Sequence, residues 1–257
     1  MQIDYSTVTE MAGDDISQEQ LERLCHRYYW AAGYCKNKDV VEVACGTGPG
    51  VGYLASHAKS FSAGDFDSGI LGVAQKHYRD RIELEQFDAQ EMPFEDNSKD
   101  VVILFEAIYY LPDTDKFVKE CKRVLRPGGQ VLIATANKDL YDFNPSLFSH
   151  KYFNSPELQE LFEKYGFSVG CFGYLSVGDV SLIQKVLRPI KKVAVGLNIV
   201  PKTMGFKKIL KRFVFGELIP MPAEITEGMV AYTSPTPIPI EILDNTHKVL
   251  YCFATLE

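Results

Sequence analysis

A short glycine-rich segment near the amino terminus has the residue types of a ligand-binding loop. The apolar residues 40–44, interrupted by Glu42, lead into a turn that contains Gly46, Gly48 and Gly50. Glycines let the backbone turn sharply and let a ligand approach without a Cβ in the way. A helix that begins after such a turn offers free N–H groups to a polar ligand. The pattern therefore predicts a binding loop between a strand and a helix.

A carboxylate follows the next predicted strand. Residues 61–65 end in Asp65, and Asp67 lies two positions further on. A carboxylate at the end of this strand can accept hydrogen bonds from both hydroxyls of an adenosine ribose. A nicotinamide-binding loop would share these features, but the G-x-G-x-x-G fingerprint fails, because its third glycine would fall on Val51 or Tyr53. The loop alone therefore does not define the cofactor.

The elements that position these residues alternate along the chain. The spacing of apolar residues predicts strands at 39–44, 61–65, 82–86, 100–106, 130–136, 167–175 and 248–256, and helices at 50–57, 68–79, 114–125 and 155–165. A serine, Ser68, is the expected cap of the second helix. Strands that alternate with helices imply right-handed crossovers and parallel pairing. We predict an α/β fold with a doubly wound, mainly parallel sheet of seven strands.

Three further segments, taken in order, give a specific resemblance. They are Phe87-Asp88-Ala89-Gln90-Glu91-Met92-Pro93-Phe94, the apolar strand at 100–106, and Leu125-Arg126-Pro127-Gly128-Gly129. Together with the glycine-rich turn, this series resembles the class I S-adenosylmethionine-dependent methyltransferases, particularly the group that acts on small molecules and sugars. The resemblance covers about residues 25–175 and implies a Rossmann-like fold with S-adenosylmethionine as the cofactor.

The resemblance also implies which residues bind the cofactor. Glu42 and the glycines would lie along its methionine part, Asp65 would hold the ribose, and Asp88 would meet the exocyclic amine of the adenine. Asp67 is either a second choice for the ribose or a helix N-terminal carboxylate. Tyr28, in a leading helix that would close over the cofactor, is alternatively a packing residue, as is Trp30. The full predicted set is Tyr28, Glu42, Ala44, Gly46, Gly48, Asp65, Phe66, Asp88, Ala89 and Phe105.

The acceptor side is expected after the fourth and fifth strands. Methyl transfer needs an acceptor lone pair in line with the carbon–sulfur bond, and a hydroxyl acceptor also needs a base. Glu106 is a candidate base or orienting group, with hydrogen bonding to the loop backbone as its alternative role. Tyr110 stands where many relatives carry a histidine, and His150 is a second candidate base or else a surface residue. The predicted catalytic residues are Glu106, His150 and Tyr110, and the predicted acceptor contacts are Tyr109, Asn137 and Tyr152.

The chain divides into four predicted segments. They are an N-terminal helical cap at 1–38, a cofactor-binding α/β core at 39–177, a basic helical insertion or lid at 178–246, and the last strand at 247–257. Nine lysines and arginines lie between 185 and 212, with no acidic residue from 180 to 215. These cations are interpreted as a solvated face of amphipathic helices, as a lid that binds phosphate on the substrate, or as a contact with an anionic membrane surface.

The composition narrows the class of protein. The net charge of −7 over 257 residues argues against nucleic-acid binding. The acidic start lacks the features of a secretory signal, and six cysteines without a C-x-x-C pair suggest reduced thiols in a cytoplasmic protein. No histidine shows metal-ligand spacing, so no metal is expected.

The sequence favours O-methylation of a small or glycan-related acceptor, including a phosphorylated sugar. The alternatives are C- or N-methylation of an aromatic, quinone-like or lipid acceptor, and a non-catalytic partner subunit that binds the cofactor.

Overall fold

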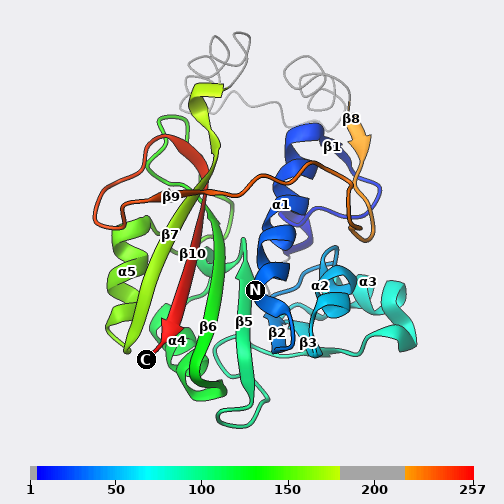
Figure 1. The fold of residues 1–257 in the computed structure, drawn as a ribbon. Helices are drawn as coiled ribbons and strands as arrows, with labels where there is room; N and C mark the ends of the chain where they lie inside the picture. The colour runs from blue at the N-terminus through cyan, green and yellow to red at the C-terminus, as the bar shows by residue number, and fades with distance from the viewer. Residues whose placement is uncertain (1–4, 180–217) are drawn as a thin grey trace.

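The computed structural model describes residues 5–179 and 218–257 (Figure 1). The helices of this part are α1 (Gln18–Cys35), α2 (Val51–His57), α3 (Ser68–Tyr78), α4 (Thr114–Val124) and α5 (Ser155–Glu163). The strands are β1 (Asp15–Ser17), β2 (Asp39–Val43), β3 (Ser60–Asp65), β4 (Leu84–Gln86), β5 (Lys99–Phe105), β6 (Leu125–Ala136), β7 (Phe167–Ser176), β8 (Leu218–Pro220), β9 (Thr236–Ile238) and β10 (His247–Leu256).

One sheet of eight strands organises the fold, in the order β4-β3-β2-β5-β6-β10-β7-β9. The first five strands in this order, β4, β3, β2, β5 and β6, are parallel to one another. Strand β10 lies between β6 and β7 and is antiparallel to both. The predicted doubly wound α/β fold is confirmed, with β9 as an additional edge strand. Strand order reverses between β2 and β5, and in such sheets ligands bind at the carboxyl ends of the strands beside this reversal.

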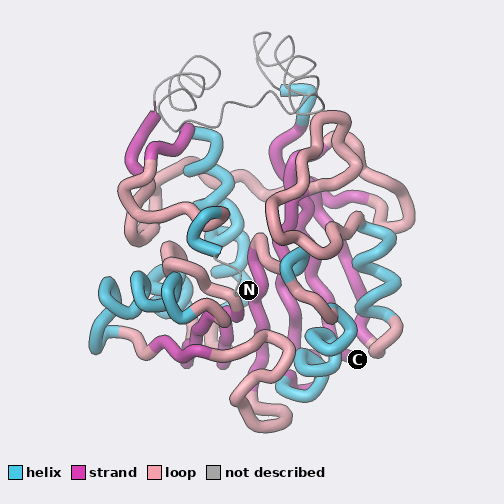
Figure 2. Tube along the Cα trace, turned by 180° about the vertical axis from the view of Figure 1, so that it is seen from behind, coloured by secondary structure: helices cyan, strands magenta, loops and turns pink. Residues whose placement is uncertain are grey.

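Helices cover both faces of the sheet (Figures 1 and 2). In β5, Val102 and Leu104 belong to the apolar cluster that contains α4 and α5, whereas Ile103 and Phe105 belong to the cluster that contains α1. Because β5 is buried on both faces, its sequence is a continuous apolar run. All six cysteines are buried free thiols, as the sequence suggests.

Two local predictions are wrong in detail. The cap of α3 is Asp67 and not Ser68, since Asp67 Oδ1 accepts hydrogen bonds from the backbone N–H groups of Gly69 and Ile70. The segment 126–129 does not separate helix from strand, because α4 ends at Val124 and β6 begins at Leu125. There, β6 continues through the glycines and pairs with β5 across a register shift.

The predicted insertion is only partly described. Residues 180–217, which include all nine of the cations noted above, lie outside the described residues. The described remainder, 218–246, contains β8, which pairs with β1, and β9, which pairs with β7. It contains no helix, so the prediction of a helical insertion is wrong for this part. In the described ranges, no helix combines the length and apolar content needed to cross a bilayer.

The described end of the insertion, residues 218–233, lies against the half of the sheet that carries the glycine loop and α2. Ile225 N–H donates to the carbonyl of Pro49 at 2.8 Å, and Tyr53 donates to Glu227 at 2.6 Å. The segment 218–233 therefore packs over α2 without forming a separate core.

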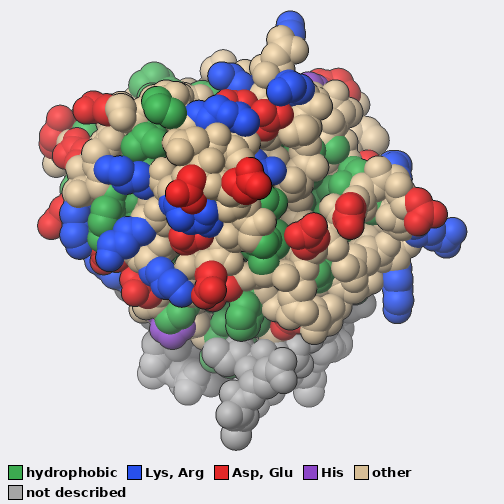
Figure 3. Space-filling view, turned by 90° about the horizontal axis from the view of Figure 1, so that it is seen from below, with side chains coloured by type: hydrophobic (Ala, Val, Ile, Leu, Met, Phe, Trp, Pro, Cys, Tyr) green, Lys and Arg blue, Asp and Glu red, His purple; other side chains and the backbone are tan. Residues whose placement is uncertain are grey.

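The surface is mixed in charge elsewhere. Acidic and basic side chains are interspersed over the face seen from below (Figure 3).

Candidate cofactor and acceptor site

The glycine loop follows β2 and has the conformation that its glycines allow. Gly46 and Gly48 have φ angles of +61° and +77°. A Cβ at Gly48 would lie 3.0 Å from both the Ala74 Cβ and the Tyr78 ring, so a side chain there would be strained and crowded. Tyr78 donates a hydrogen bond of 2.7 Å to the Gly48 carbonyl and accepts one of 3.1 Å from Gly52 N–H. Tyr78 thus fixes the loop and the first turn of α2. Ala44, just before the loop, also has a positive φ, +55°.

Asp65 connects the glycine loop to the end of β3. Its Oδ2 accepts a hydrogen bond from Gly46 N–H at 2.8 Å, and its Oδ1 accepts one from Asp67 N–H at 2.9 Å. A carboxylate offers about four lone-pair sites, so each oxygen can still accept one more donor. Burial raises the pKa of Asp65, whereas these backbone bonds favour the charged form. The arrangement suits the two hydroxyls of a ribose.

Glu42 is a buried carboxylate in β2, only 1 % exposed. Its Oε1 accepts a hydrogen bond of 2.7 Å from the Tyr28 hydroxyl, and its buried Oε2 has no partner. Burial raises the pKa of Glu42 to about 7, although Tyr28 and Arg27 lower it. An unpartnered buried acceptor is costly, about 1–3 kcal/mol. It fits the ammonium group of a methionine moiety, so the residues present fit S-adenosylmethionine.

Tyr28 and Phe105 contribute to this end of the site through packing. Both are buried, and their rings meet edge to face with centroids 5.4 Å apart. The Tyr28 ring lies so close to Gly50 that a Cβ there would come within 2.0 Å of it. Trp30 stacks on Tyr251 at 4.9 Å. Tyr28 therefore positions Glu42 and the loop, consistent with the packing alternative.

The predicted adenine side is formed by three loop residues. Asp88 Oδ1 accepts hydrogen bonds from the backbone and side chain of Gln90. Gln90 in turn accepts from Asp113 N–H at 2.9 Å, which fixes the loop after β4. Ala89 is buried, whereas Phe66, at the end of β3, is 64 % exposed. An exposed ring at this strand end is available to cover a flat base.

Glu106 follows β5, across the strand-order reversal from the glycine loop. Its φ is +52° and its N–H donates to the Ala134 carbonyl at 2.8 Å. Its Oε2 accepts a hydrogen bond of 3.2 Å from Tyr109, and its Oε1 lies 3.5 Å from Arg23 and 3.9 Å from Arg27. The strained backbone and the ion pairs hold the carboxylate at the carboxyl edge.

An aromatic group surrounds Glu106. Tyr109 stacks on Tyr152 with centroids 4.1 Å apart, and burial raises the pKa of Tyr109 well above its ordinary value. Tyr110 shares a hydrogen bond of 2.5 Å with Ser146, and its ring meets Tyr5 edge to face at 5.5 Å. These tyrosines remain protonated near neutral pH, so Tyr110 is a donor or a packing residue and not a substitute for a histidine base.

Two predicted residues are not brought into this group. His150 is exposed, and its backbone N–H donates to the Tyr109 carbonyl at 2.7 Å. Its imidazole makes no hydrogen bond or ring contact within the described residues. Asn137 is 1 % exposed; its Nδ2 donates to the carbonyls of Asp244 and His247, and its Oδ1 accepts from Asp139 N–H. Asn137 therefore anchors a loop through both of its amide N–H groups, and its role as an acceptor contact stays a prediction.

Arg23 and Arg27 are the site residues that sequence reasoning missed. They lie one helical turn apart on α1, where an i, i+4 pair shares one face. The i, i+4 spacing of the two arginines indicates that they share a helix face, but it does not show which strand end that face contacts.

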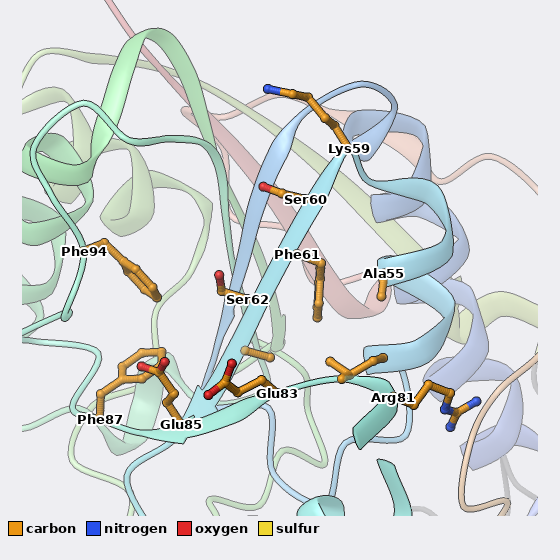
Figure 4. Close-up of a pocket in the computed structure, with 12 residues that line it drawn as sticks. Ala55, Lys59, Ser60, Phe61, Ser62, Arg81, Glu83, Glu85, Phe87 and Phe94 are labelled. Atoms are coloured by element: carbon orange, nitrogen blue, oxygen red, sulfur yellow. The ribbon is translucent and has the colours of Figure 1, made fainter. Parts of the chain in front are cut away.

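A pocket of about 340 Å³ lies away from this site, at the edge of the sheet beside β3 and β4 (Figure 4). Strand β4 pairs only with Ala63–Asp65 of β3, which leaves the first half of that β3 edge open. The lining residues are Ala55, Lys59, Ser60, Phe61, Ser62, Ala63, Arg81, Ile82, Glu83, Glu85, Phe87 and Phe94. None of them is a predicted site residue.

The fold and the loop geometry fit a Rossmann-like cofactor-binding protein, and comparison with known proteins shows which families the chain resembles. Residues 41–133 match the model of the methyltransferase domain family. A probable S-adenosylmethionine-dependent methyltransferase of Mycolicibacterium smegmatis is 36 % identical over 154 residues, covering 58 % of this chain and 56 % of that protein. A probable phthiotriol/phenolphthiotriol dimycocerosates methyltransferase 2 of Mycobacterium ulcerans is 43 % identical over 95 residues, covering 36 % of this chain and 37 % of that one.

The solved structures agree in fold. A SAM-dependent methyltransferase of Thermotoga maritima, described as a possible histamine N-methyltransferase, has a TM-score of 0.56 at 16 % identity, covering 93 % of this chain and 95 % of that one. The chain spans about half the length of the first curated relatives it matches. The domain match and these relatives support the class I S-adenosylmethionine-dependent methyltransferase family, with S-adenosylmethionine as the cofactor.

Proposed function

We propose that the protein transfers the methyl group of S-adenosylmethionine to a hydroxyl of a small or glycan-related acceptor. The observation that carries this proposal is the Glu106 carboxylate at the end of β5, fixed by Tyr109 and Arg23. It lies across the strand-order reversal from the glycine loop and Glu42. A hydroxyl acceptor needs a group of this kind, whereas a neutral amine acceptor does not.

The residues of the chain would act mainly by positioning. S-adenosylmethionine supplies an activated methyl group when bound. Glu106 would accept the hydrogen bond of the acceptor hydroxyl and take its proton as the carbon–oxygen bond forms and the methyl carbon–sulfur bond breaks, with S-adenosylhomocysteine as the leaving group. The two arginines form ion pairs with the carboxylate and hold it in place. Orientation is therefore expected to contribute more than proton transfer.

The names of the curated relatives support an oxygen acceptor. Several are named for phthiotriol and phenolphthiotriol dimycocerosates. A triol carries hydroxyl groups, but these relatives are lipid methyltransferases, so their names support an oxygen acceptor and not a glycan in particular. The aromatic group around Tyr109 and Tyr152 fits a flat acceptor face, which sugars and aromatic compounds both offer. The atom that carries the methyl group in the product distinguishes O-methylation from C- or N-methylation.

The test is turnover with methyl-13C-labelled S-adenosylmethionine against a panel of glycans, triols and phenols. We expect a methoxy carbon signal in the product. Glu106→Gln should lower kcat by about 10²–10⁴-fold, with the affinity for S-adenosylhomocysteine unchanged. Glu95→Gln is the matched control, because Glu95 is exposed and away from the site. Methyl attached to carbon or nitrogen, or full activity of Glu106→Gln, would contradict the proposal. Cofactor binding without turnover on any acceptor would favour a non-catalytic subunit.

A further inference from the structure

Arg23 and Arg27 are short of acceptors. In the described part of the chain, Glu106 is the only group that forms an ion pair with either side chain, and the distances of 3.5 Å and 3.9 Å to its Oε1 are too long for close hydrogen bonds. Arg27 also lies over the Tyr28 ring, 5.5 Å from its centroid. Both guanidiniums therefore share one oxygen of one carboxylate. Each guanidinium has five N–H donors, so most of the ten donors have no partner within the described residues.

The unpartnered donors are partly buried. The Nε atoms of Arg23 and Arg27 are both inaccessible to solvent and without a hydrogen bond. Their side chains are only 31 % and 18 % exposed. Leaving a buried donor unpaired costs about 1–3 kcal/mol. Two such donors on one helix face indicate a place where a ligand supplies the missing acceptors.

In the described part of the chain, no group other than Glu106 forms a hydrogen bond or ion pair with the side chains of these two arginines, although the charges of Glu10 and Glu42 also act on Arg27. Tyr28 and Tyr251 lie beside Arg27, and burial raises the pKa of each phenol well above its ordinary value, so both are neutral. Glu10 also lies near Arg27, but its carboxylate accepts a hydrogen bond from Gln20. Glu42 is already bonded to Tyr28. The pair therefore keeps the capacity for one more anion beside Glu106.

We propose that Arg23 and Arg27 bind an anionic group, a phosphate or a carboxylate, of the methyl acceptor. The inference rests on the proposed function, because it places the acceptor hydroxyl at Glu106 Oε2 and the anion at the neighbouring guanidiniums. Planar guanidiniums bind such groups through paired hydrogen bonds. The acceptor class is then a hydroxyl compound with an anionic substituent close to the methylated position, such as a sugar phosphate or a sugar acid.

Substitution of Glu106 should affect anion binding and turnover in opposite directions. Its Oε1 competes with the incoming anion for the same two guanidiniums, while its Oε2, which accepts one hydrogen bond from Tyr109, has a lone pair left for the hydroxyl. Glu106→Gln removes the competing charge. It should therefore strengthen anion binding while it lowers turnover, whereas substitution of either arginine should weaken anion binding.

The experiment measures inorganic phosphate binding to the full chain saturated with S-adenosylhomocysteine, by 31P line broadening. We expect Arg23→Gln and Arg27→Gln to weaken phosphate binding at least tenfold and Glu106→Gln to strengthen it severalfold. Arg126→Gln is the matched control, because Arg126 pairs with Asp39 and Asp100 at the amino edge of the sheet. Arg27→Lys retains the charge and should fold normally, but it should lose part of the affinity because the paired donors are lost. Unchanged phosphate binding in the arginine variants, or weaker binding in Glu106→Gln, would overturn the proposal.

A second arm separates the acceptor from the cofactor as the source of the anion. S-adenosylhomocysteine carries a carboxylate that 5′-methylthioadenosine lacks. If the arginines bound the cofactor, their variants would lose affinity for the first compound and not for the second, and this proposal would be wrong. If the KM ratio between neutral and phosphorylated hydroxyl acceptors stayed unchanged in Arg27→Gln while Glu106→Gln was inactive, the inference would fail and the proposed function would stand.

Discussion

The hydroxyl of Tyr28 donates a hydrogen bond of 2.7 Å to Glu42 Oε1 and so joins helix α1 to strand β2. This bond favours the charged carboxylate, yet burial outweighs it and raises the pKa of Glu42 to about 7. The other oxygen, Oε2, has no partner. The fold thus holds a carboxyl group in an environment that penalises its charge, which is typical of a site built for a ligand.

Glu42→Gln should stabilise the free protein above neutral pH. The folded protein binds the Glu42 proton more tightly than the unfolded chain does between about pH 4.5 and 7. The wild-type carboxylate therefore destabilises the fold increasingly as pH rises through this window. We expect no gain for the variant near pH 4.5 and a gain of about 1–3 kcal/mol at pH 8, measured by urea unfolding. The same variant should bind S-adenosylhomocysteine more weakly, and a pH-independent difference in stability would contradict this assignment.

His26 should have the opposite pH dependence. Its Nε2 faces the Thr233 carbonyl at 2.6 Å and its Nδ1 faces the Tyr251 hydroxyl at 2.9 Å, so the neutral ring fits with a proton on Nε2. Burial lowers the pKa of His26 from 6.5 to about 4. The unfolded chain binds the proton more tightly in that window, so this contribution to stability is lost as pH falls from about 6.5 to 4.

His26→Gln should therefore be less stable than wild type at pH 7.5, with a deficit that shrinks by about 2–3 kcal/mol on going to pH 4. Urea unfolding at several pH values measures it. The wild-type profile alone is a poor test, because Glu42 contributes with the opposite sign in an overlapping window. A stability deficit of His26→Gln that stays constant with pH would mean that burial does not lower the pKa of His26 in the folded protein.

The apolar strands could be predicted because burial on both faces of the sheet gives a continuous run of apolar residues. The run Val101, Val102, Ile103, Leu104 and Phe105 is buried on both faces of the sheet and has no polar alternation to misread. Strand β9 could not be predicted in the same way. It has three residues, one of them a proline, and it is a strand only because β7 pairs with it.

The site shows the same division between local and distant causes. The loop conformation of Gly46 and Gly48 arises within one strand–turn–helix unit, so the sequence indicates it, whereas Asp65 binds this loop from the end of the neighbouring strand β3. The anchoring role of Asn137 could not be predicted, because the carbonyls that its amide binds, those of Asp244 and His247, lie more than 100 positions away along the chain. Arg23 and Arg27 depend likewise on the docking of α1 beside β5.

Gly64→Ala and Gly72→Ala should change stability in opposite directions. A Cβ at Gly64 would lie 2.1 Å from the Glu85 carbonyl oxygen on the neighbouring strand β4, so β3 and β4 would have to separate. We expect a loss of about 1–3 kcal/mol. A Cβ at Gly72, inside α3, meets no atom within 4 Å, and alanine there should add about 0.5–1 kcal/mol. Thermal unfolding of both variants checks this, and equal effects would contradict the pairing of β4 with β3.

The roles of Asp65 and Asp67 can be separated by one pair of variants. Asp67 Oδ1 is engaged by the N–H groups of Gly69 and Ile70 as the cap of α3, so Asp67→Ala should lower stability by about 1 kcal/mol. Asp65 has both oxygens facing the loop, each with one lone-pair site left, so Asp65→Asn loses one backbone bond and one ribose acceptor together. Calorimetric titration with S-adenosylhomocysteine should show at least a tenfold loss of affinity, about 1.4 kcal/mol, for Asp65→Asn and a far smaller change for Asp67→Ala. The reverse ranking would assign the ribose to Asp67 and leave Asp65 as a support of the glycine loop.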